Sequence, residues 1–419
     1  MPKHRLLLKG LGVLVTCVWP HVAYAAPAES SPASVTLWGI PVAFVLFGVT
    51  LLGVALLHRW TFEVAVTGLA VIVTYTLVTT DLNLVAHLRH EARLLANLLG
   101  LLLGFAILAR QFEDSHVPEW LPKWLPDDWT GGFALLGLVA VLSTFLDNIA
   151  AAMIGGVMAN KLYKGQVSVG FLAAIVAAAN AGGAGSVIGD TTTTMMWIAG
   201  VPALHVAEAF IAAAAAVVFS GIVAGRAQHR RQPILKDPHR ARRIDTGRLG
   251  VVGLMIAGTI TANVVLDFPA VGLWVAILLG TAIRPTPWGE LSRAAKGSLF
   301  LCSLVLSASL MPVKALPDPS WQTALGLGFV SAVFDNIPLT ALALYQGGYD
   351  WGILAFTVGY GGSMIWFGSS AGVAICNLFP EARDTARWLA EGWHVAVAYV
   401  VGFFVMLALI GWHPDVLPH

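Results

Sequence analysis

The sequence carries little charge: only 11% of its 419 residues are Asp, Glu, Lys or Arg, whereas 57% are hydrophobic. A soluble globular chain carries about 25% charged residues. Together with a mean hydropathy of +0.77, this predicts an all-α protein that crosses a membrane several times. The net charge of +1 indicates no basic surface for nucleic acid, so we expect a lipid bilayer and no nucleic acid among the partners.

Cysteine is also scarce. The three cysteines, Cys17, Cys302 and Cys376, match neither a disulfide framework nor the spacing of a metal site. The last two are expected to be small apolar packing residues. We expect no cofactor and no enzymatic activity.

Residues 1–25 have the features of a secretory signal peptide: a basic start, an apolar centre and a cleavage site at Ala23-Tyr24-Ala25. The alternative is an uncleaved first helix. Residues 26–37 are rich in Pro, Ser and Ala and are expected to form an external tail. A cleaved signal places the mature N-terminus outside the cell.

Two series of apolar stretches follow, separated by a basic linker at 226–248. Because cytoplasmic loops are enriched in Lys and Arg, we expect this linker in the cytoplasm. It divides the chain into a first transmembrane repeat, 38–225, and a second, 249–412. Each repeat is expected to contain three spans, a re-entrant hairpin, a broken helix and a final span. The simple spans are predicted at 40–57, 62–79, 94–110, 203–225, 249–266, 270–284, 297–313 and 392–411.

Each repeat contains an Asp-Asn pair inside an apolar run. The first is Asp147-Asn148, and the second is Asp335-Asn336, 188 positions later. An ionisable group at the bilayer centre costs roughly 2.5–3.5 kcal/mol on insertion scales, so these acids are candidates for function. Their matching positions indicate a duplicated fold in which each copy contributes half of one site.

The segment around the first pair, 133–160, is too long for one span. Its 28 residues would form a helix of about 42 Å, whereas the hydrocarbon core is about 30 Å thick. We therefore expect a hairpin with its tip near Asp147, and a second hairpin at 323–346. Hairpins that return to the side from which they enter place the basic linker inside and invert the second repeat relative to the first.

A glycine-rich stretch follows each pair, at 180–194 and at 359–370, and is expected to unwind a helix. Aligning the two stretches places Asp190 opposite Ser369, so the first repeat carries an extra carboxylate. Unwound backbone at membrane depth exposes carbonyl oxygens and is tolerated only where it is buried or lines a polar cavity.

Carboxylates, hydroxyls and exposed carbonyls, with no Lys or Arg nearby in sequence, favour a cation or a proton as substrate. We predict Na+ at Asp147, Asp190 and Asp335, where protonation and cation binding can compete and so produce exchange. The complete predicted binding set is Asp147, Asn148, Asn180, Gly182, Gly183, Asp190, Thr191, Asp335, Asn336, Gly361, Gly362, Ser363, Ser369 and Ser370.

Three structural explanations compete with this interpretation. The Asp-Asn pairs can cap half-helices, since both residue types are good N-caps. The glycine pairs can allow close packing between helices. The threonines at 191–194 can return hydrogen bonds to backbone carbonyls one turn earlier.

The motifs Phe145-Leu-Asp147-Asn148 and Phe334-Asp335-Asn336, with the stretch 180–191 after the first, resemble NhaD-type sodium/proton antiporters. These belong to the ion transporter superfamily, with arsenite permeases and citrate transporter-like proteins. The resemblance covers residues 35–412. It implies a homodimer with two re-entrant hairpins and two broken helices, in which the substrate binds near the hairpin tips.

The leading hypothesis is therefore a Na+/H+ antiporter of a bacterial inner membrane, working by alternating access with a site at the bilayer midplane. The alternative is a carrier of citrate, another organic anion or arsenite on the same fold. An intramembrane aspartyl protease is a third class, but it requires Gly-x-Gly-Asp where this chain has Val187-Ile-Gly-Asp190.

Overall fold

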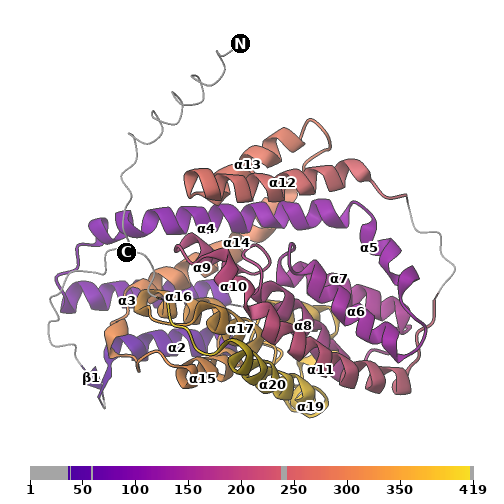
Figure 1. Ribbon diagram of the computed structural model, residues 1–419. Coiled ribbons are helices and arrows are strands. Elements are labelled where there is room, and N and C mark those ends of the chain that lie inside the picture. The colour runs from indigo at the N-terminus through magenta and orange to yellow at the C-terminus, as the bar shows by residue number, and fades with distance from the viewer. Residues whose placement is uncertain (1–35, 38, 58–59, 237–242, 416–419) are drawn as a thin grey trace.

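The computed structural model describes residues 36–37, 39–57, 60–236 and 243–415, and the predicted signal peptide lies outside them. The described part is almost entirely helical (Figure 1), and the prediction of an all-α polytopic membrane protein is confirmed. Of the predicted tail, Thr36–Leu37 is described and forms β1, which pairs antiparallel with β2 (Ile40–Pro41). Within the described part, six helices are long and apolar enough to cross a membrane: Thr61–Thr79, Leu84–Glu113, Ala203–Arg231, Thr246–Leu266, Gly289–Ser309 and Trp393–Ile410.

The same order of elements occurs twice along the chain. The first series is α2 (Val42–Leu56), α3 (Thr61–Thr79), α4 (Leu84–Glu113), the short α5 (Val117–Trp120) and η1 (Leu121–Trp124), α6 (Trp129–Leu142), α7 (Asn148–Leu162), α8 (Val169–Ala184), α9 (Thr191–Ile198), α10 (Ala203–Ala207) and α11 (Ala209–Arg231). The second is α12 (Thr246–Leu266), α13 (Pro269–Gly280), α14 (Gly289–Ser309), η2 (Val313–Ala315), α15 (Trp321–Ser331), α16 (Asn336–Gln346), α17 (Trp351–Gly361), α18 (Ser370–Leu378), η3 (Pro380–Arg383), α19 (Thr385–Glu391) and α20 (Trp393–Ile410).

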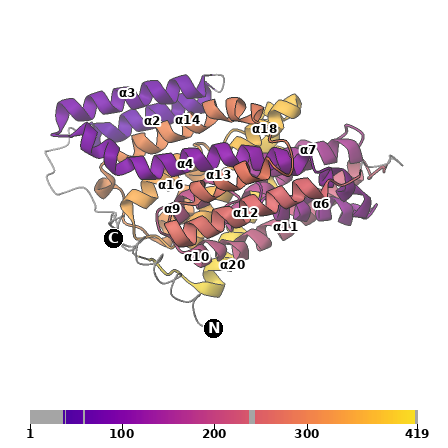
Figure 2. The same ribbon diagram turned by 90° about the horizontal axis from the view of Figure 1, so that it is seen from above.

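Several predicted span boundaries are wrong because polar residues extend the helices, including the start of α14, which lies at Gly289 rather than at 297. Helix α4 begins at Leu84 rather than at 94 and runs across much of the molecule (Figure 2). Its first turns are stabilised by partners on the second repeat, since the Tyr345 hydroxyl donates to buried Glu91 at 2.7 Å. Helix α11 continues to Arg231 and α12 begins at Thr246, so the predicted linker 226–248 contains a helix end on each side.

A pair of helices joined at a short tip lies at each position where a hairpin is predicted. Helices α6 and α7 meet at a tip that contains Asp147, and α15 and α16 meet at a tip that contains Asp335. The 14 residues of α6 extend about 21 Å, which is less than the hydrocarbon thickness of about 30 Å. Each arm therefore ends inside the bundle.

The hairpins open at opposite ends of the bundle, and α4 provides the reference. The open end of the second hairpin contacts the first turns of α4 through Tyr345 and Glu91. Beyond the last turn of α4, the Ser115 carbonyl accepts from the backbone N–H of Asp245 in the linker. The linker also meets the open end of the first hairpin, where Leu235 N–H donates to the Leu162 carbonyl at 2.8 Å. Figure 1 shows α6 and α7 on the right and α15 and α16 on the left.

Helices α8 and α17 are buried along their entire length and pack against each other at the centre. The chain breaks after them, at 185–190 and at 362–369. The breaks lie within the two stretches where unwinding is predicted, but just after the glycines: Gly182, Gly183 and Gly361 lie within the helices. At two of them a side chain would overlap a hairpin backbone: Gly182 meets the carbonyl of Ala140, and Gly361 meets that of Gly328. Their role is close packing of each hairpin against a broken helix.

This packing predicts the effect of adding a methyl group. Gly182→Ala and Gly361→Ala should each lower the free energy of unfolding by about 1–3 kcal/mol, because neither backbone can move away without displacing a hairpin. The measurement is the thermal unfolding midpoint of the purified protein in detergent.

Gly137 and Gly326 provide matched controls in α6 and α15, the hairpin arms that Gly182 and Gly361 contact. A Cβ at either control position would meet no atom within 4 Å. Gly137→Ala and Gly326→Ala should leave the midpoint unchanged or raise it, since Ala is the better helix former by about 1 kcal/mol. Equal midpoints for all four variants would contradict the packing argument.

Candidate functional site

Each of the four chain breaks places a polar residue at a helix N-cap. Asp147 and Asp335 precede α7 and α16 at the hairpin tips, and Asp190 and Ser369 precede α9 and α18. The capping explanation holds for the second repeat, where Asp335 accepts from the N–H of Ile337 at 3.0 Å and Ser369 caps α18. The side chains of Asp147 and Asp190 make no capping hydrogen bond of this geometry, but the backbone N–H groups that begin α7 and α9 still favour their negative charge.

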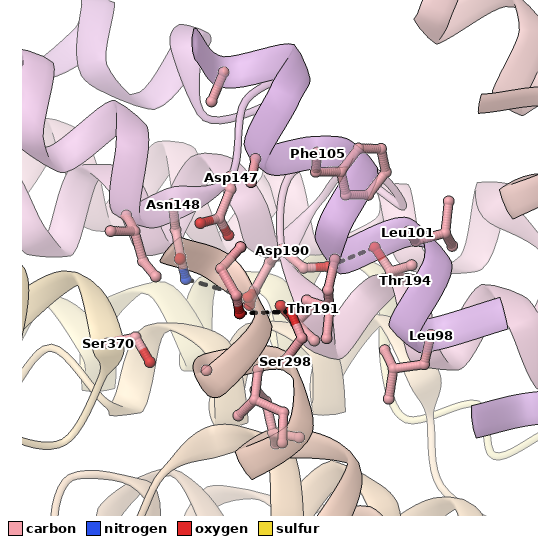
Figure 3. A pocket seen from close by; sticks show the side chains of 18 of the residues that line it. Leu98, Leu101, Phe105, Asp147, Asn148, Asp190, Thr191, Thr194, Ser298 and Ser370 are labelled. Atoms are coloured by element: carbon pink, nitrogen blue, oxygen red, sulfur yellow. Dashed lines mark hydrogen bonds between the residues drawn. The ribbon is translucent and has the colours of Figure 1, made fainter. Parts of the chain in front are cut away.

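The carboxylate of Asp190 joins both hairpin tips. The Nδ2 of Asn148 donates to Asp190 Oδ1 at 3.1 Å, a bond drawn in Figure 3. From the second tip, Asn336 Nδ2 approaches Asp190 Oδ2 at 3.5 Å. The hydroxyl of Thr192 donates to the same oxygen at 2.6 Å. Asp190 therefore connects residues 188 positions apart in the chain.

Asn180 links the two broken helices. Its side chain on α8 is fully buried, and its Nδ2 donates to the hydroxyls of Ser363 at 2.9 Å and Ser369 at 3.1 Å. Its Oδ1 accepts from Asn148 Nδ2 at 3.1 Å. The network thus crosses from the first hairpin tip to the second break, and the predicted residues Asn148, Asn180, Asp190, Asn336, Ser363 and Ser369 are all part of it.

A cavity of about 330 Å³ opens beside this network. Apolar side chains of α4 and α14 form one wall, and Leu98, Leu101 and Phe105 are labelled in Figure 3. Its polar lining includes the predicted residues Asp147, Asn148, Asp190, Thr191, Asn336 and Ser370. Arg293 also lines the cavity. No Lys or Arg lies near the acids in the sequence, but the fold brings this arginine to the same cavity. That guanidinium is bonded to Glu290 at 2.8 Å.

Asp335 lines a second cavity, of about 210 Å³, with Ser369 and Ser370. Within the described residues, no group of three His, Cys, Asp or Glu side chains is placed to hold one metal ion. The prediction of Na+ at Asp147, Asp190 and Asp335 stays a prediction, and the two tip acids, Asp147 and Asp335, line different cavities. Asp190 nevertheless interacts electrostatically with both other acids.

The remaining predicted residues have structural roles. Gly182, Gly183, Gly361 and Gly362 line neither of the two cavities. The back-bonding explanation holds for Thr194, whose hydroxyl donates to the Asp190 carbonyl at 2.8 Å. Sequence reasoning missed the bond from Thr192 to the Asp190 carboxylate; its position two residues after an N-cap acid was the available signal.

A family model described as "Citrate transporter" matches residues 33–361, which include both Asp-Asn pairs and the first break. The chain belongs to the citrate transporter family. Membership makes it a transporter rather than an enzyme, and the predicted resemblance at the level of the superfamily is confirmed.

Curated relatives of this family member are similar at modest identity over most of their length. "Na(+)/H(+) antiporter NhaD" of Alkalimonas amylolytica is 26% identical, over 97% of this chain and 96% of the relative. "Sodium/proton antiporter 1" of Arabidopsis thaliana is 26% identical, over 89% of this chain and 73% of the relative. "Na(+)/H(+) antiporter NhaD" of Vibrio parahaemolyticus is 27% identical, over 69% of this chain and 84% of the relative.

The central position of Asn180 predicts a large effect on stability. Asn180→Ala removes a side chain that forms three hydrogen bonds, with Asn148, Ser363 and Ser369, and leaves these buried groups without that partner, which should cost about 1–3 kcal/mol. The thermal unfolding midpoint should fall accordingly. Asn160→Ala, at an exposed position of α7, is the matched control and should leave the midpoint within error of the unmodified protein. A midpoint for Asn180→Ala equal to the control would contradict a bonded network.

Proposed function

We propose that this citrate transporter family member exchanges Na+ for H+. One observation carries the proposal: tips from opposite ends of the bundle bring Asn148 and Asn336 to a single carboxylate, Asp190, beside a cavity that Asp147 also lines. Carboxylate and amide oxygens suit a hard cation. The names of the relatives from Alkalimonas amylolytica and Arabidopsis thaliana support the same substrate pair.

Exchange follows from competition for the same negative charge. Like charges at Asp147, Asp190 and Asp335 repel one another in a low-dielectric interior, and either a proton or a cation relieves that repulsion. Because either a proton or a Na+ ion is enough to relieve the repulsion, binding of one favours release of the other. Alternating access then requires that the site, near the bilayer midplane, opens to one side at a time.

The family description favours citrate as a second candidate substrate. The 330 Å³ cavity could hold a small organic anion. However, its two carboxylates would repel citrate, and Arg293, the cation in its lining, is bonded to Glu290. The transport assay therefore includes citrate as a direct comparison.

For the membrane arrangement, we propose a bacterial inner membrane, with a periplasmic mature N-terminus and the linker in the cytoplasm. The arginines at the end of α11 and in the following segment support this side. A homodimer, implied by the resemblance, completes the proposal.

Neutralising the tip acids should stop exchange. In everted vesicles with an internal acid pH, added Na+ should dequench a pH-sensitive dye, and Asp147→Asn or Asp335→Asn should reduce this signal about tenfold or more, as expected for functional acids in the membrane. Li+, K+ and citrate are added in turn to define the substrate. Asp81→Asn, at an exposed position, is the control. Normal Na+-dependent signals in both tip variants would refute the proposed function.

Sidedness is tested by labelling single cysteines. In a background without Cys17, Cys302 and Cys376, a membrane-impermeant maleimide added to intact cells should label Leu204→Cys, which is 81% exposed. The same reagent should label Arg231→Cys, exposed at the end of α11, only after the cells are opened. The reverse pattern would place the linker in the periplasm.

A further inference from the structure

The carboxylate of Asp190 already accepts several hydrogen bonds, which is not expected of a carboxylate whose oxygens are free to bind a cation. Three donors already occupy it: Asn148 Nδ2 on Oδ1, and Thr192 Oγ1 and Asn336 Nδ2 on Oδ2. The residue is only 4% exposed. Asp147, by contrast, lines the cavity and interacts with backbone N–H groups of its own hairpin tip.

Asp190 has no carboxylate counterpart in the second repeat. The position that matches it in the second repeat is Ser369, whose hydroxyl caps α18 and accepts from Asn180. Both hairpin tips therefore bond to the carboxylate of the first repeat.

The direction of the two tip amides follows from these bonds. An asparagine side chain can turn either its NH2 or its carbonyl toward a site. Asp190 accepts the NH2 of both Asn148 and Asn336, and Asn180 accepts a second hydrogen from Asn148. Both tip residues line the cavity, so the groups left for a bound ion are their Oδ1 carbonyls. A reversed amide would present hydrogens and repel a cation.

We propose that Asp190 is a positioning residue: it holds both hairpin-tip amides by their NH2 groups so that their carbonyl oxygens face the cation. This inference rests on the proposed cation site. It assigns the ion contact to Asp147, Asn148 and Asn336, and it explains why one central carboxylate serves two tips.

Asp190→Asn tests the inference because it keeps the shape but places an NH2 where an acceptor was. One tip amide must then lose its bond or reverse. The apparent Na+ affinity, measured as the half-maximal Na+ concentration for thermal stabilisation of the purified protein, should weaken about tenfold or more. In vesicles the KM for Na+ should rise equally, while the maximal rate at saturating Na+ falls less than about threefold.

A swap separates positioning from a merely structural role. In the double variant Asp190→Asn with Asn148→Asp, residue 190 can donate Nδ2 to the new carboxylate at 148 and still accept from Asn336 and Thr192. The serine hydroxyls bonded to Asn180 can reverse direction to suit a rotated Asn180. Na+ affinity should return to within about threefold of the unmodified protein, with the new carboxylate at 148 taking the place of the Asn148 carbonyl at the ion. The swap also provides the test if Asp190→Asn alone does not fold.

Each other outcome overturns the inference. Unchanged Na+ affinity in Asp190→Asn, with only a lower melting midpoint, would make Asp190 structural. Loss of Na+ binding in Asp190→Asn that the swap does not restore would make Asp190 a direct ligand. Asp81→Asn should match the unmodified protein throughout. If the unmodified protein binds Na+ but moves no protons, the proposed function fails while the binding test of Asp190 still applies.

Discussion

Polar groups at the centre of an apolar bundle must find partners within the protein, and the rest of this structure depends on that constraint. The breaks at 185–190 and 362–369 leave backbone groups outside any helix. Hairpin and broken helix satisfy each other: the Ser186 hydroxyl donates to the Thr144 carbonyl, and that of Ser331 to the Val358 carbonyl at 2.7 Å. Close contacts at Gly182 and Gly361 bring the backbones near enough for these bonds.

The two repeats share this framework but contribute different side chains. Asn180 and Asp190 of the first repeat correspond in the sequence alignment to Gly359 and Ser369 of the second. A Cβ at Gly359 would lie 3.3 Å from Ala184 and 3.6 Å from a carboxylate oxygen of Asp190. The centre therefore has space for the side chains of Asn180 and Asp190 only because the second repeat has the small residues Gly359 and Ser369 at the matching positions. A single site between two similar halves is the physical consequence.

The wall opposite the hairpin tips comes from helices outside the broken region. Apolar residues of α4 and α14 line the larger cavity, and Phe300 and Ser370 line both cavities. Such a wall keeps the local dielectric low, which strengthens both the repulsion among the acids and their attraction for an ion.

The sequence by itself determined the membrane class, the duplication, both hairpins and most members of the network, because hydropathy, motif spacing and the rarity of buried acids are properties of local residues. It did not place the start of α4, since Glu91 is accommodated there by Tyr345, which lies 254 positions away. Only the tertiary structure decided that Asp335 faces a separate cavity and that Asp190 bonds to both tips. Those relations depend on how hairpins from opposite ends of the bundle meet, and no local pattern encodes that geometry.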